Sequence, residues 1–300
     1  MLPSCFRKPR LLIVGCGDVG LRLAALARPR FRVLALTSSE HRVSALRAAG
    51  IVPLRGNLDD ATSLWRLAGV ARWVAVLAPP PNTGDDDPRS RHLANVLRRH
   101  MIGSAPADAL RLVYASTTGV YGDCNGALID ETRRPAPRTA RALRRLDAER
   151  RWRALGRRAG ARVAVLRIPG IYDGAARSPR RRLVQGLPVL RAEDDVFTNH
   201  IHADDLARIT LRALFVAAPN RVYHASDASR LRMGEYFDLA ADLYALPRAP
   251  RVARADAGTA GLSPQALSFM DESRRLDNRR LGELGLALRY PDVAAGLAQD

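Results

Sequence analysis

The feature that most restricts the fold is a series of six short apolar runs separated by segments of helical character. Each run has the length of a strand and a continuous apolar interior, with polar residues mainly near its ends and without the alternation of a sheet that has one wet face. Continuous hydrophobicity means that other elements cover both faces, which is typical of a parallel sheet. The sequence therefore predicts an α/β fold with a doubly wound parallel Rossmann sheet. The runs are residues 10–14, 31–37, 51–54, 73–78, 111–116 and 162–167.

After about residue 168 the pattern becomes irregular and richer in proline, glycine and arginine. We therefore expect a Rossmann domain over residues 1–167 and a smaller substrate-side α+β region over residues 168–300, partly interleaved with it. The further elements expected are helices near residues 203–217, 232–245 and 277–285 and a short strand at residues 221–226.

The first apolar run leads directly into a glycine-rich turn, Gly15-Cys16-Gly17-Asp18-Val19-Gly20, and then into an alanine- and leucine-rich segment. A G-x-G-x-x-G turn placed between a strand and a helix is typical of dinucleotide binding. Gly15 allows the tight turn, Gly17 lets the backbone approach a pyrophosphate, and Gly20 lets the helix pack closely on the strand. The N-terminus of that helix then faces the phosphates, with Asp18 and Val19 completing the turn.

The end of the second run favours NADP over NAD. An acidic residue there would hold the ribose 2′-hydroxyl of NAD, but the sequence has Thr37-Ser38-Ser39, followed by Arg42. Hydroxyl donors and an arginine tolerate a 2′-phosphate, although Arg42 is equally compatible with an exposed position on a helix. Ala78 and Pro79 follow the fourth run, where a doubly wound sheet opens its ligand crevice.

The order and spacing of several motifs resemble those of the extended short-chain dehydrogenase/reductases, a group that contains the NAD-dependent epimerase/dehydratases of nucleotide sugars. Besides the glycine turn, the motifs are G-N-L-D at 56–59, S-T-T-G-V-Y-G at 116–122, L-R-I-P-G-I-Y at 166–172 and H-I-H-A-D-D-L-A at 200–207. The resemblance covers nearly the whole chain. It implies an adenine site at Asn57, Leu58 and Asp59, and a catalytic hydroxyl at Thr117 beside Ser116 in the cofactor pocket. It places Arg141, Arg167, Tyr172, His202 and Asp204 on the substrate side.

One departure from the family is decisive. Members carry Tyr-x-x-x-Lys on the helix after the fifth strand, and alignment on Glu149 puts Arg141 and Arg145 in those positions. Arginine does not exchange a proton near neutral pH. This resembles the atypical branch of the superfamily, which keeps the cofactor fold and alters the catalytic set.

Three functions are compatible with these residues. The first is an NAD(P)-dependent oxidoreductase or epimerase/dehydratase-like enzyme with a rearranged acid at Tyr121 or Tyr172, or with a substrate that needs none. The second is a non-catalytic cofactor-binding sensor or scaffold, and the third is a nucleic-acid binder. The sequence favours the first, with a small-molecule substrate and a monomer or homodimer.

The charge alone does not establish a nucleic-acid partner. Forty-eight Lys and Arg residues against 30 Asp and Glu give a net charge of +18, and Lys8 is the only lysine. The densest arginine runs, residues 141–158 and 177–182, lack the interleaved aromatics of single-strand binders. We interpret them as solvated helix faces and expect no specific nucleic acid.

The remaining expectations concern location and metals. No apolar stretch reaches the length of a membrane span and no secretory signal is present, so a cytoplasmic protein without membrane contact is predicted. The three cysteines are predicted to be reduced thiols. His200, His202 and Asp204 could be read as metal ligands, but a strand that enters an Asp-capped helix explains them better, and no metal is expected.

Overall fold

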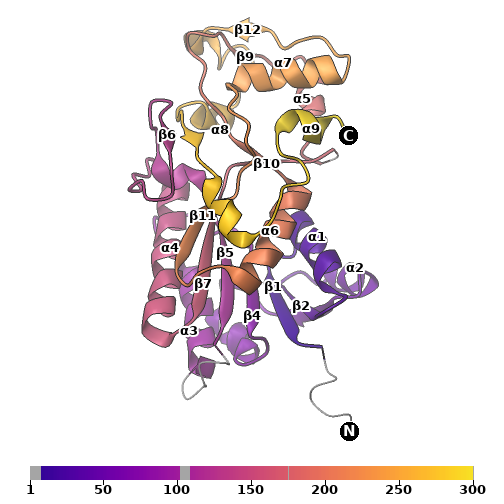
Figure 1. The fold of residues 1–300 in the computed structure, drawn as a ribbon, viewed down its shortest axis with the longest axis vertical. Coiled ribbons are helices and arrows are strands. Elements are labelled where there is room, and N and C mark those ends of the chain that lie inside the picture. The colour runs from indigo at the N-terminus through magenta and orange to yellow at the C-terminus, as the bar shows by residue number, and fades with distance from the viewer. Residues whose placement is uncertain (1–7, 102–108, 175, 300) are drawn as a thin grey trace. The chain divides into compact units, whose positions relative to one another are not determined.

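The computed structural model describes residues 8–101, 109–174 and 176–299, which fall into two compact units (Figure 1). Three segments form each unit because the chain passes repeatedly from one unit to the other. Unit 1 comprises Met1–Thr117, Thr139–Arg167 and Leu206–Tyr223; unit 2 comprises Thr118–Arg138, Ile168–Asp205 and His224–Asp300.

Unit 1 is built on a seven-stranded sheet, and all six predicted runs are strands of it. The strand order is β11-β7-β5-β4-β1-β2-β3. From β1 the chain adds β2 and β3 on one side and then β4 and β5 on the other, as in a doubly wound fold. The pairs β1–β2, β2–β3, β1–β4 and β4–β5 are parallel. The strands are β1 (Arg10–Val14), β2 (Arg32–Thr37), β3 (Val52–Arg55), β4 (Trp73–Val76), β5 (Arg111–Thr117), β7 (Arg162–Ile168) and β11 (Arg221–His224).

The helices of unit 1 cover the apolar faces of these strands. Alternate residues such as Leu12, Leu34 and Val74 lie in register across neighbouring strands and belong to one buried cluster with Leu93 and Trp152. Each such side chain contributes about 1.5–3 kcal/mol on burial, so the sheet can carry long polar loops at its ends. The elements are α1 (Asp18–Ala27), α2 (Arg42–Ala48), η2 (Ala61–Leu67), α3 (Pro88–Met101), α4 (Ala140–Ala159) and α6 (Ala203–Val216).

The helix α4 has sequence-coded ends. The Thr139 hydroxyl accepts a hydrogen bond from the Ala142 N–H, which satisfies one of the free donors of the first turn. The helix stops at Gly160, whose φ of 71° is a left-handed conformation that glycine adopts readily. These two signals set where α4 begins and ends, and Arg145 and Glu149 lie on its side that faces β5.

Unit 2 contains three small parallel strand pairs and short helices. The pairs join β8 (Gly170–Tyr172) with β10 (His200–His202), β9 (Val189–Leu190) with β12 (Arg251–Val252), and β6 (Leu128–Ile129) with β13 (Arg275–Leu276). The helix predicted near residues 277–285 is the 3₁₀ helix η6 (Arg279–Leu284). The other helices are η4 (Thr118–Tyr121), α5 (Arg180–Val184), α7 (Met233–Leu243), η5 (Arg254–Asp256), α8 (Pro264–Phe269) and α9 (Val293–Leu297).

The core of unit 2 groups aromatic and aliphatic side chains of α7 and α9 around Tyr172. In the described part of the chain, no helix has both the length and the apolar character needed to cross a membrane.

Candidate functional site

The glycine-rich turn joins β1 to α1 and uses its three glycines for three different reasons. Gly15 has φ of 91°, and a Cβ built on it would lie 2.3 Å from the backbone nitrogen of Ala78. A Cβ on Gly20 would lie 3.0 Å from the Gly15 carbonyl oxygen. Both positions therefore require glycine for the turn itself and for the close approach of α1 to the sheet.

Gly17 differs from both, because a Cβ built there would meet no atom within 4 Å. Its φ of −78° suits any residue, so the backbone does not demand a glycine. Gly17 is also the N-cap of α1, where free N–H groups create a positive end. The turn thus has the open, donor-lined surface that a pyrophosphate needs.

Arg42, the first residue of α2, connects the segment after β2 with this turn. The Arg42 guanidinium donates to the Cys16 carbonyl at 2.6 Å, so the side chain reaches back from α2 to the glycine turn. The Ser39 N–H donates to the Thr37 hydroxyl, which orders the loop, while Ser38 is exposed. Glu40, the nearest carboxylate along the chain, is ion-paired with Arg55.

The loops after β3 and β4 complete the same end of the sheet. The Asn57 side-chain oxygen accepts from the Asp59 N–H, and the Leu58 carbonyl contacts His92 at 2.9 Å. The Asp59 carboxylate forms a two-point ion pair with Arg89 at 2.6 Å, and these hydrogen bonds lower the Asp59 pKa. Arg89 also donates to the Pro79 carbonyl. Sequence reasoning missed Arg89 because nothing in its helix marked it as a partner of the G-N-L-D loop.

The end of β5 carries a buried polar group that involves Ser116. The Ser116 hydroxyl donates to the Glu149 carboxylate at 2.5 Å, and Arg167 donates to the same carboxylate at 3.1 and 2.7 Å. Arg167 and Glu149 are 3 % and 2 % exposed. Ser116 thus anchors β5 to α4 and β7, while Thr117, the next residue, is only partly buried.

Arg145, which the sequence resemblance aligns with the family lysine, is held in place by this same strand. Its guanidinium donates to the Ala115 carbonyl at 2.7 Å and to the Tyr114 hydroxyl at 3.3 Å. Burial raises the pKa of Tyr114 to about 12, so this phenol stays protonated. Arg141 lies one turn earlier on α4 and is exposed.

The arginine run on α4 is therefore not a uniformly solvated face, and this part of the sequence interpretation is wrong. Arg144 is 6 % exposed and donates to the Gly84 carbonyl. Arg145 is partly buried against β5. The reason is that backbone carbonyls of loops and strand ends offer guanidinium groups an acceptor without any carboxylate.

In unit 2, Tyr121 is buried in a polar cluster. Its hydroxyl lies 2.5 Å from His224 Nε2, and His224 Nδ1 lies 2.8 Å from the Asp277 carbonyl. The backbone N–H of His224 donates to the Glu131 carboxylate, which is ion-paired with Arg280. His224 was not singled out from the sequence, where R-V-Y-H-A-S gave only a strand signal.

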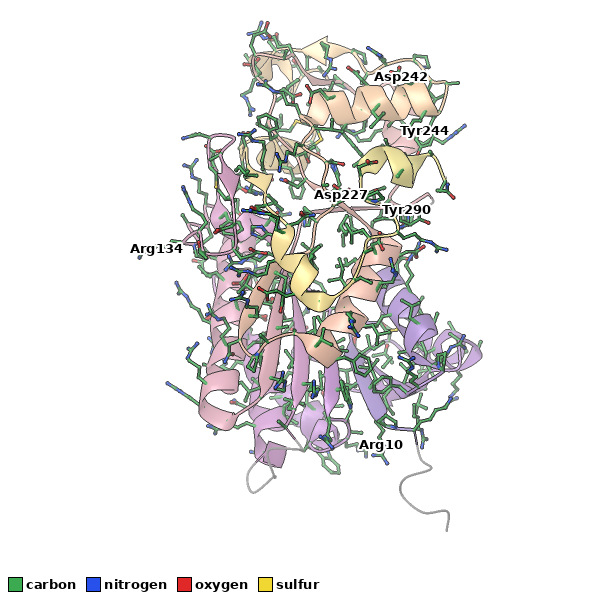
Figure 2. The ribbon with its side chains drawn as sticks, in the orientation of Figure 1. Arg10, Arg134, Asp227, Asp242, Tyr244 and Tyr290 are labelled. Carbon is green, nitrogen blue, oxygen red and sulfur yellow. The ribbon has the colours of Figure 1, made fainter. Side chains whose placement is uncertain are left out.

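Tyr172 is also buried, and its hydroxyl donates to the Asp292 carbonyl at 3.3 Å. Burial, with the nearby Asp227 carboxylate, raises the Tyr172 pKa far above its ordinary value. Burial likewise raises the pKa of Asp227 to about 7, and its Oδ2 atom has no hydrogen-bond partner among the described residues. Asp227 and Tyr290 are both labelled in Figure 2.

The histidines of H-I-H-A-D-D-L-A belong to the packed interior of unit 2. The His200 ring stacks on Tyr236 at 4.1 Å, and burial lowers its pKa to about 3. His202 Nδ1 accepts from the Asp204 N–H, where the chain enters α6. In residues 8–101, 109–174 and 176–299, no three His, Cys, Asp or Glu side chains are grouped to hold a metal ion.

Two of the three cysteines lie in the described ranges. Cys16 and Cys124 are buried free thiols, and burial raises the Cys16 pKa to about 11, so this thiol stays protonated. Cys5 lies outside the described residues.

No family model matches the chain. The chain is 27 % identical over 295 residues to Protein YeeZ of Escherichia coli (strain K12), an alignment that covers 94 % of this chain and 97 % of that protein.

The chain is similar to solved structures over nearly its whole length. A functionally unknown conserved protein from Silicibacter pomeroyi DSS has a TM-score of 0.80 and 28 % identity, with 97 % of this chain and 98 % of that chain covered. UDP-glucuronic acid 4-epimerase from Bacillus cereus in complex with NAD has a TM-score of 0.73 and 14 % identity, with 96 % of each chain covered. The doubly wound α/β fold and the resemblance to extended short-chain dehydrogenase/reductases are thereby confirmed at the level of the fold.

Proposed function

We propose that unit 1 binds a nicotinamide dinucleotide at the turn between β1 and α1, and that the protein is an oxidoreductase or epimerase/dehydratase-like enzyme with an atypical active site. The observation that carries the proposal is the contrast within the glycine turn. Two glycines are required by the fold, whereas Gly17 leaves open space at the positive end of a helix. A similar fold holds NAD in the Bacillus cereus epimerase.

The preferred form is NADP, with NAD as the alternative. Arg42 is held beside the glycine turn by its bond to the Cys16 carbonyl, and a guanidinium has further donors available for a 2′-phosphate. Glu40 is engaged by Arg55, which leaves the hydroxyl-rich end of β2 without a free carboxylate for a ribose 2′-hydroxyl. The remaining cofactor contacts are proposed at Asp18, Val19, Asn57, Leu58, Ala78, Pro79 and Ser116.

At the nicotinamide end, the cofactor would supply hydride acceptance or donation, and the chain would supply the positioning. Thr117 would donate a hydrogen bond to the reacting oxygen. Arg145 would place a fixed positive charge near the end of β5, because its bonds to Ala115 and Tyr114 hold it there. A guanidinium stabilises developing negative charge but does not give up its proton.

The proton donor is proposed to be Tyr121 or Tyr172, and Arg141, Arg167, His202 and Asp204 are proposed for the substrate side. The substrate class is a nucleotide sugar or another small carbonyl or alcohol. Arg167 would act indirectly, because its guanidinium is bound to Glu149. We further propose a cytoplasmic monomer or homodimer.

The first experiment is titration of the purified chain with NADPH and NADH, followed by fluorescence. We expect NADPH to bind at least as tightly as NADH. Binding of NADH alone would overturn the NADP preference, and binding of neither would overturn the central proposal.

The second experiment addresses turnover. Carbonyl and alcohol substrates are screened by NADPH absorbance, and any activity is compared in Thr117→Val, Tyr121→Phe and Tyr172→Phe. Loss in one tyrosine variant identifies the acid, and activity unaffected by all three would refute the site assignment. The double variant Arg141→Tyr, Arg145→Lys should raise turnover by about 10² to 10⁴ if only the proton-transfer pair is missing.

A cofactor-binding sensor or scaffold is the second candidate. The observation in its favour is that Arg145 is bonded to the strand backbone and cannot transfer a proton. Firm NADPH binding without turnover of any screened substrate, and without gain in the double variant, would favour this candidate.

A further inference from the structure

The amino edge of the unit 1 sheet, where its parallel strands begin, carries a row of arginines. Arg10 and Arg32 are directly paired across β1 and β2. The backbone N–H of Arg111 donates to the Arg72 carbonyl, and the backbone N–H of Arg162 donates to the Leu110 carbonyl, so these strand starts are also adjacent. With Arg221 at the start of β11, six adjacent strands begin with or directly follow an arginine. Strands about 4.8 Å apart make this row about 24 Å long.

Neighbouring segments add cations to the same edge. Lys8 precedes β1, and Arg28 and Arg30 lie between α1 and β2. Lys8, Arg10, Arg28 and Arg32 border a cavity of about 650 Å³ that also contacts Phe31, Val33 and Gly50. Figure 2 labels Arg10 at the start of β1. We call the nine residues Lys8, Arg10, Arg28, Arg30, Arg32, Arg72, Arg111, Arg162 and Arg221 the cationic edge.

The described carboxylates of unit 1 lie away from this edge. They sit in loops that follow strands, at the first residue of α1, or on α4, where Asp147 accepts from the Asp87 backbone N–H and Glu149 accepts from the Ser116 hydroxyl. Asp108 is outside the described residues. The described carboxylates are those of Asp18, Glu40, Asp59, Asp60, Asp85, Asp86, Asp87, Asp147 and Glu149.

Helix ends explain part of the cationic edge. Lys8 donates to the Arg28 carbonyl after α1, Arg28 to the Ala49 carbonyl after α2, and Arg111 to the Phe215 carbonyl at the end of α6. Cations at these ends interact favourably with the helix dipoles. The bonds use few of the five N–H donors of each guanidinium, so charge and donors remain for a ligand. Within the described residues, the Arg32 side chain has no partner.

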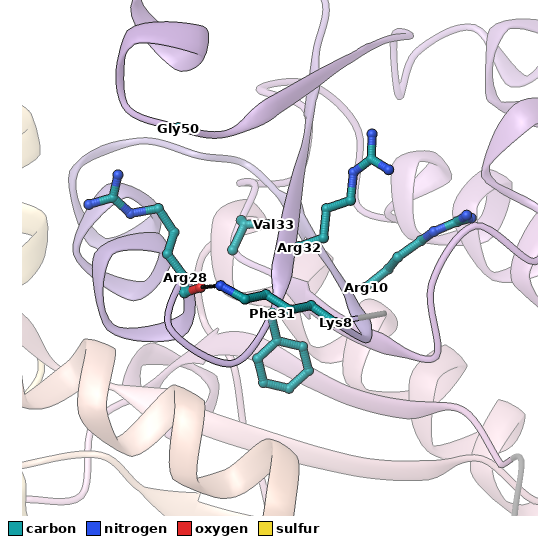
Figure 3. A pocket seen from close by; sticks show the side chains of 7 residues that line it. All are labelled: Lys8, Arg10, Arg28, Phe31, Arg32, Val33 and Gly50. Carbon is teal, nitrogen blue, oxygen red and sulfur yellow. Dashed lines mark hydrogen bonds between the residues drawn. The ribbon is translucent and has the colours of Figure 1, made fainter. Parts of the chain in front are cut away.

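The arrangement fits an extended anion better than a compact one. Figure 3 shows the Arg28 guanidinium near Gly50, whereas the Arg10 and Arg32 guanidiniums extend together on the other side of the strands. These groups do not converge on one point, as a single phosphate would require. Burial, together with repulsion from Arg162 and Arg72, lowers the Arg111 pKa, which shows that neighbouring cations of the row repel one another.

We propose that the cationic edge binds a linear polyphosphate chain, recognised through its phosphate groups. Phosphate suits guanidinium groups because it accepts two parallel N–H bonds. The aromatic residues of this edge do not offer free faces for bases: Phe31 is 3 % exposed, and Trp73 is partly buried under Arg111. The cationic edge lies where the strands begin, whereas the dinucleotide turn follows the end of β1. The proposed polyphosphate site is thus separate from that turn and independent of the function proposed above.

The first test is titration of the full chain with inorganic polyphosphate at several salt concentrations. The double variant Arg30→Ala, Arg32→Ala should bind at least about tenfold more weakly, and its salt slope should fall by about one for each cation removed. The control is Arg91→Ala, which removes an exposed cation from α3 that pairs with Asp86. We expect this control to stay within about twofold of the parent chain. An equal loss in the control and the double variant would overturn the proposal.

The second test uses the single lysine of the sequence. Acylation of Lys8 by an amine-selective reagent is followed by mass spectrometry with and without polyphosphate. Polyphosphate should slow the modification, and NADPH should not. Unchanged modification under saturating polyphosphate would place the binding elsewhere and overturn the proposal.

Two competitors identify the recognised chemistry. Polyglutamate with the same number of charges should compete poorly if phosphate geometry matters, and equal competition would reduce the site to a general anion surface. Tighter binding of single-stranded DNA with the same number of phosphates would assign the edge to nucleic acid and refute the polyphosphate assignment.

Discussion

At the carboxyl edge of the unit 1 sheet several arginines pair with carboxylates, whereas at the amino edge Lys8, Arg28 and Arg111 donate to backbone carbonyls. Arg22, Arg89 and Arg167 pair with Asp18, Asp59 and Glu149. Lys8 and Arg28 instead donate to main-chain oxygens. One residue type thus serves two purposes within a single sheet.

The two edges would therefore bind an anion in different ways. At the carboxyl edge carboxylates neutralise Arg22, Arg89 and Arg167, so the pyrophosphate of a dinucleotide would be held mainly by backbone N–H groups and the end of α1. At the amino edge the bonds of Lys8, Arg28 and Arg111 go to backbone carbonyls rather than to described carboxylates, so an anion would be held mainly by side chains. Substitutions can therefore separate the two edges.

The largest effect is expected at Gly17. Replacement by Val should reduce dinucleotide affinity by about 100-fold or more, because the side chain would occupy the space of the pyrophosphate. Folding should be preserved, since a Cβ at this position meets nothing within 4 Å. Fluorescence titration measures the affinity, and thermal unfolding checks the fold.

Gly15→Ala is the matched control for that change. Its Cβ would collide with the Ala78 backbone nitrogen, and its φ of 91° is strained for alanine. We expect this variant to lose both stability and binding. Equal behaviour of the two variants would contradict the distinction between a structural and a ligand-facing glycine. Polyphosphate affinity should be unchanged in Gly17→Val.

The next effect concerns a carboxyl-edge arginine that has lost its partner. Glu149→Gln should lower the free energy of unfolding by about 3–5 kcal/mol, because Arg167 would be left charged and buried. Urea unfolding measures the change. Asp59→Asn removes the partner of Arg89, which is more exposed, and should cost less than about 1 kcal/mol. Similar costs for both would show that burial does not set the strength of these pairs.

The sequence predicted the sheet well because strand length and continuous hydrophobicity are local properties. All six apolar runs became strands, and the order of β1 and α1 around the glycine turn followed from the motif. It could not show that Ser116 bonds Glu149 or that Tyr121 bonds His224. Those contacts join residues 33 and 103 positions apart and depend on tertiary packing.

The cationic edge illustrates the same limit from the other direction. Arg10, Arg111 and Arg162 each stand at the start of an apolar run, whereas the interpretation of charge from the sequence concerned only the arginine runs at residues 141–158 and 177–182. Only the parallel arrangement brings strand starts to one edge. The sequence shows which positions are arginine, but only the folded sheet shows that these arginines lie along one edge.

A smaller effect is expected for Arg42→Ala. If its guanidinium contacts a 2′-phosphate, NADPH affinity should fall about tenfold while NADH affinity changes little. Titration of both cofactors measures the ratio. The conservative Arg42→Lys should retain part of the preference, because a point charge remains without the two-point geometry. Equal losses for both cofactors would mean that Arg42 only supports the turn through Cys16.

The smallest effect is expected for the stability of Arg32→Ala. Arg32 is exposed and lies in register with Arg10, and its side chain has no partner among the described residues. Its removal should change the free energy of unfolding by no more than about 0.5 kcal/mol. Urea unfolding at low salt measures the change, and adding salt should reduce any gain that comes from relieved repulsion. A loss well above 1 kcal/mol would show that Arg32 stabilises the fold, and the contrast between the two edges would then be weaker, because the arginines of both would serve the structure.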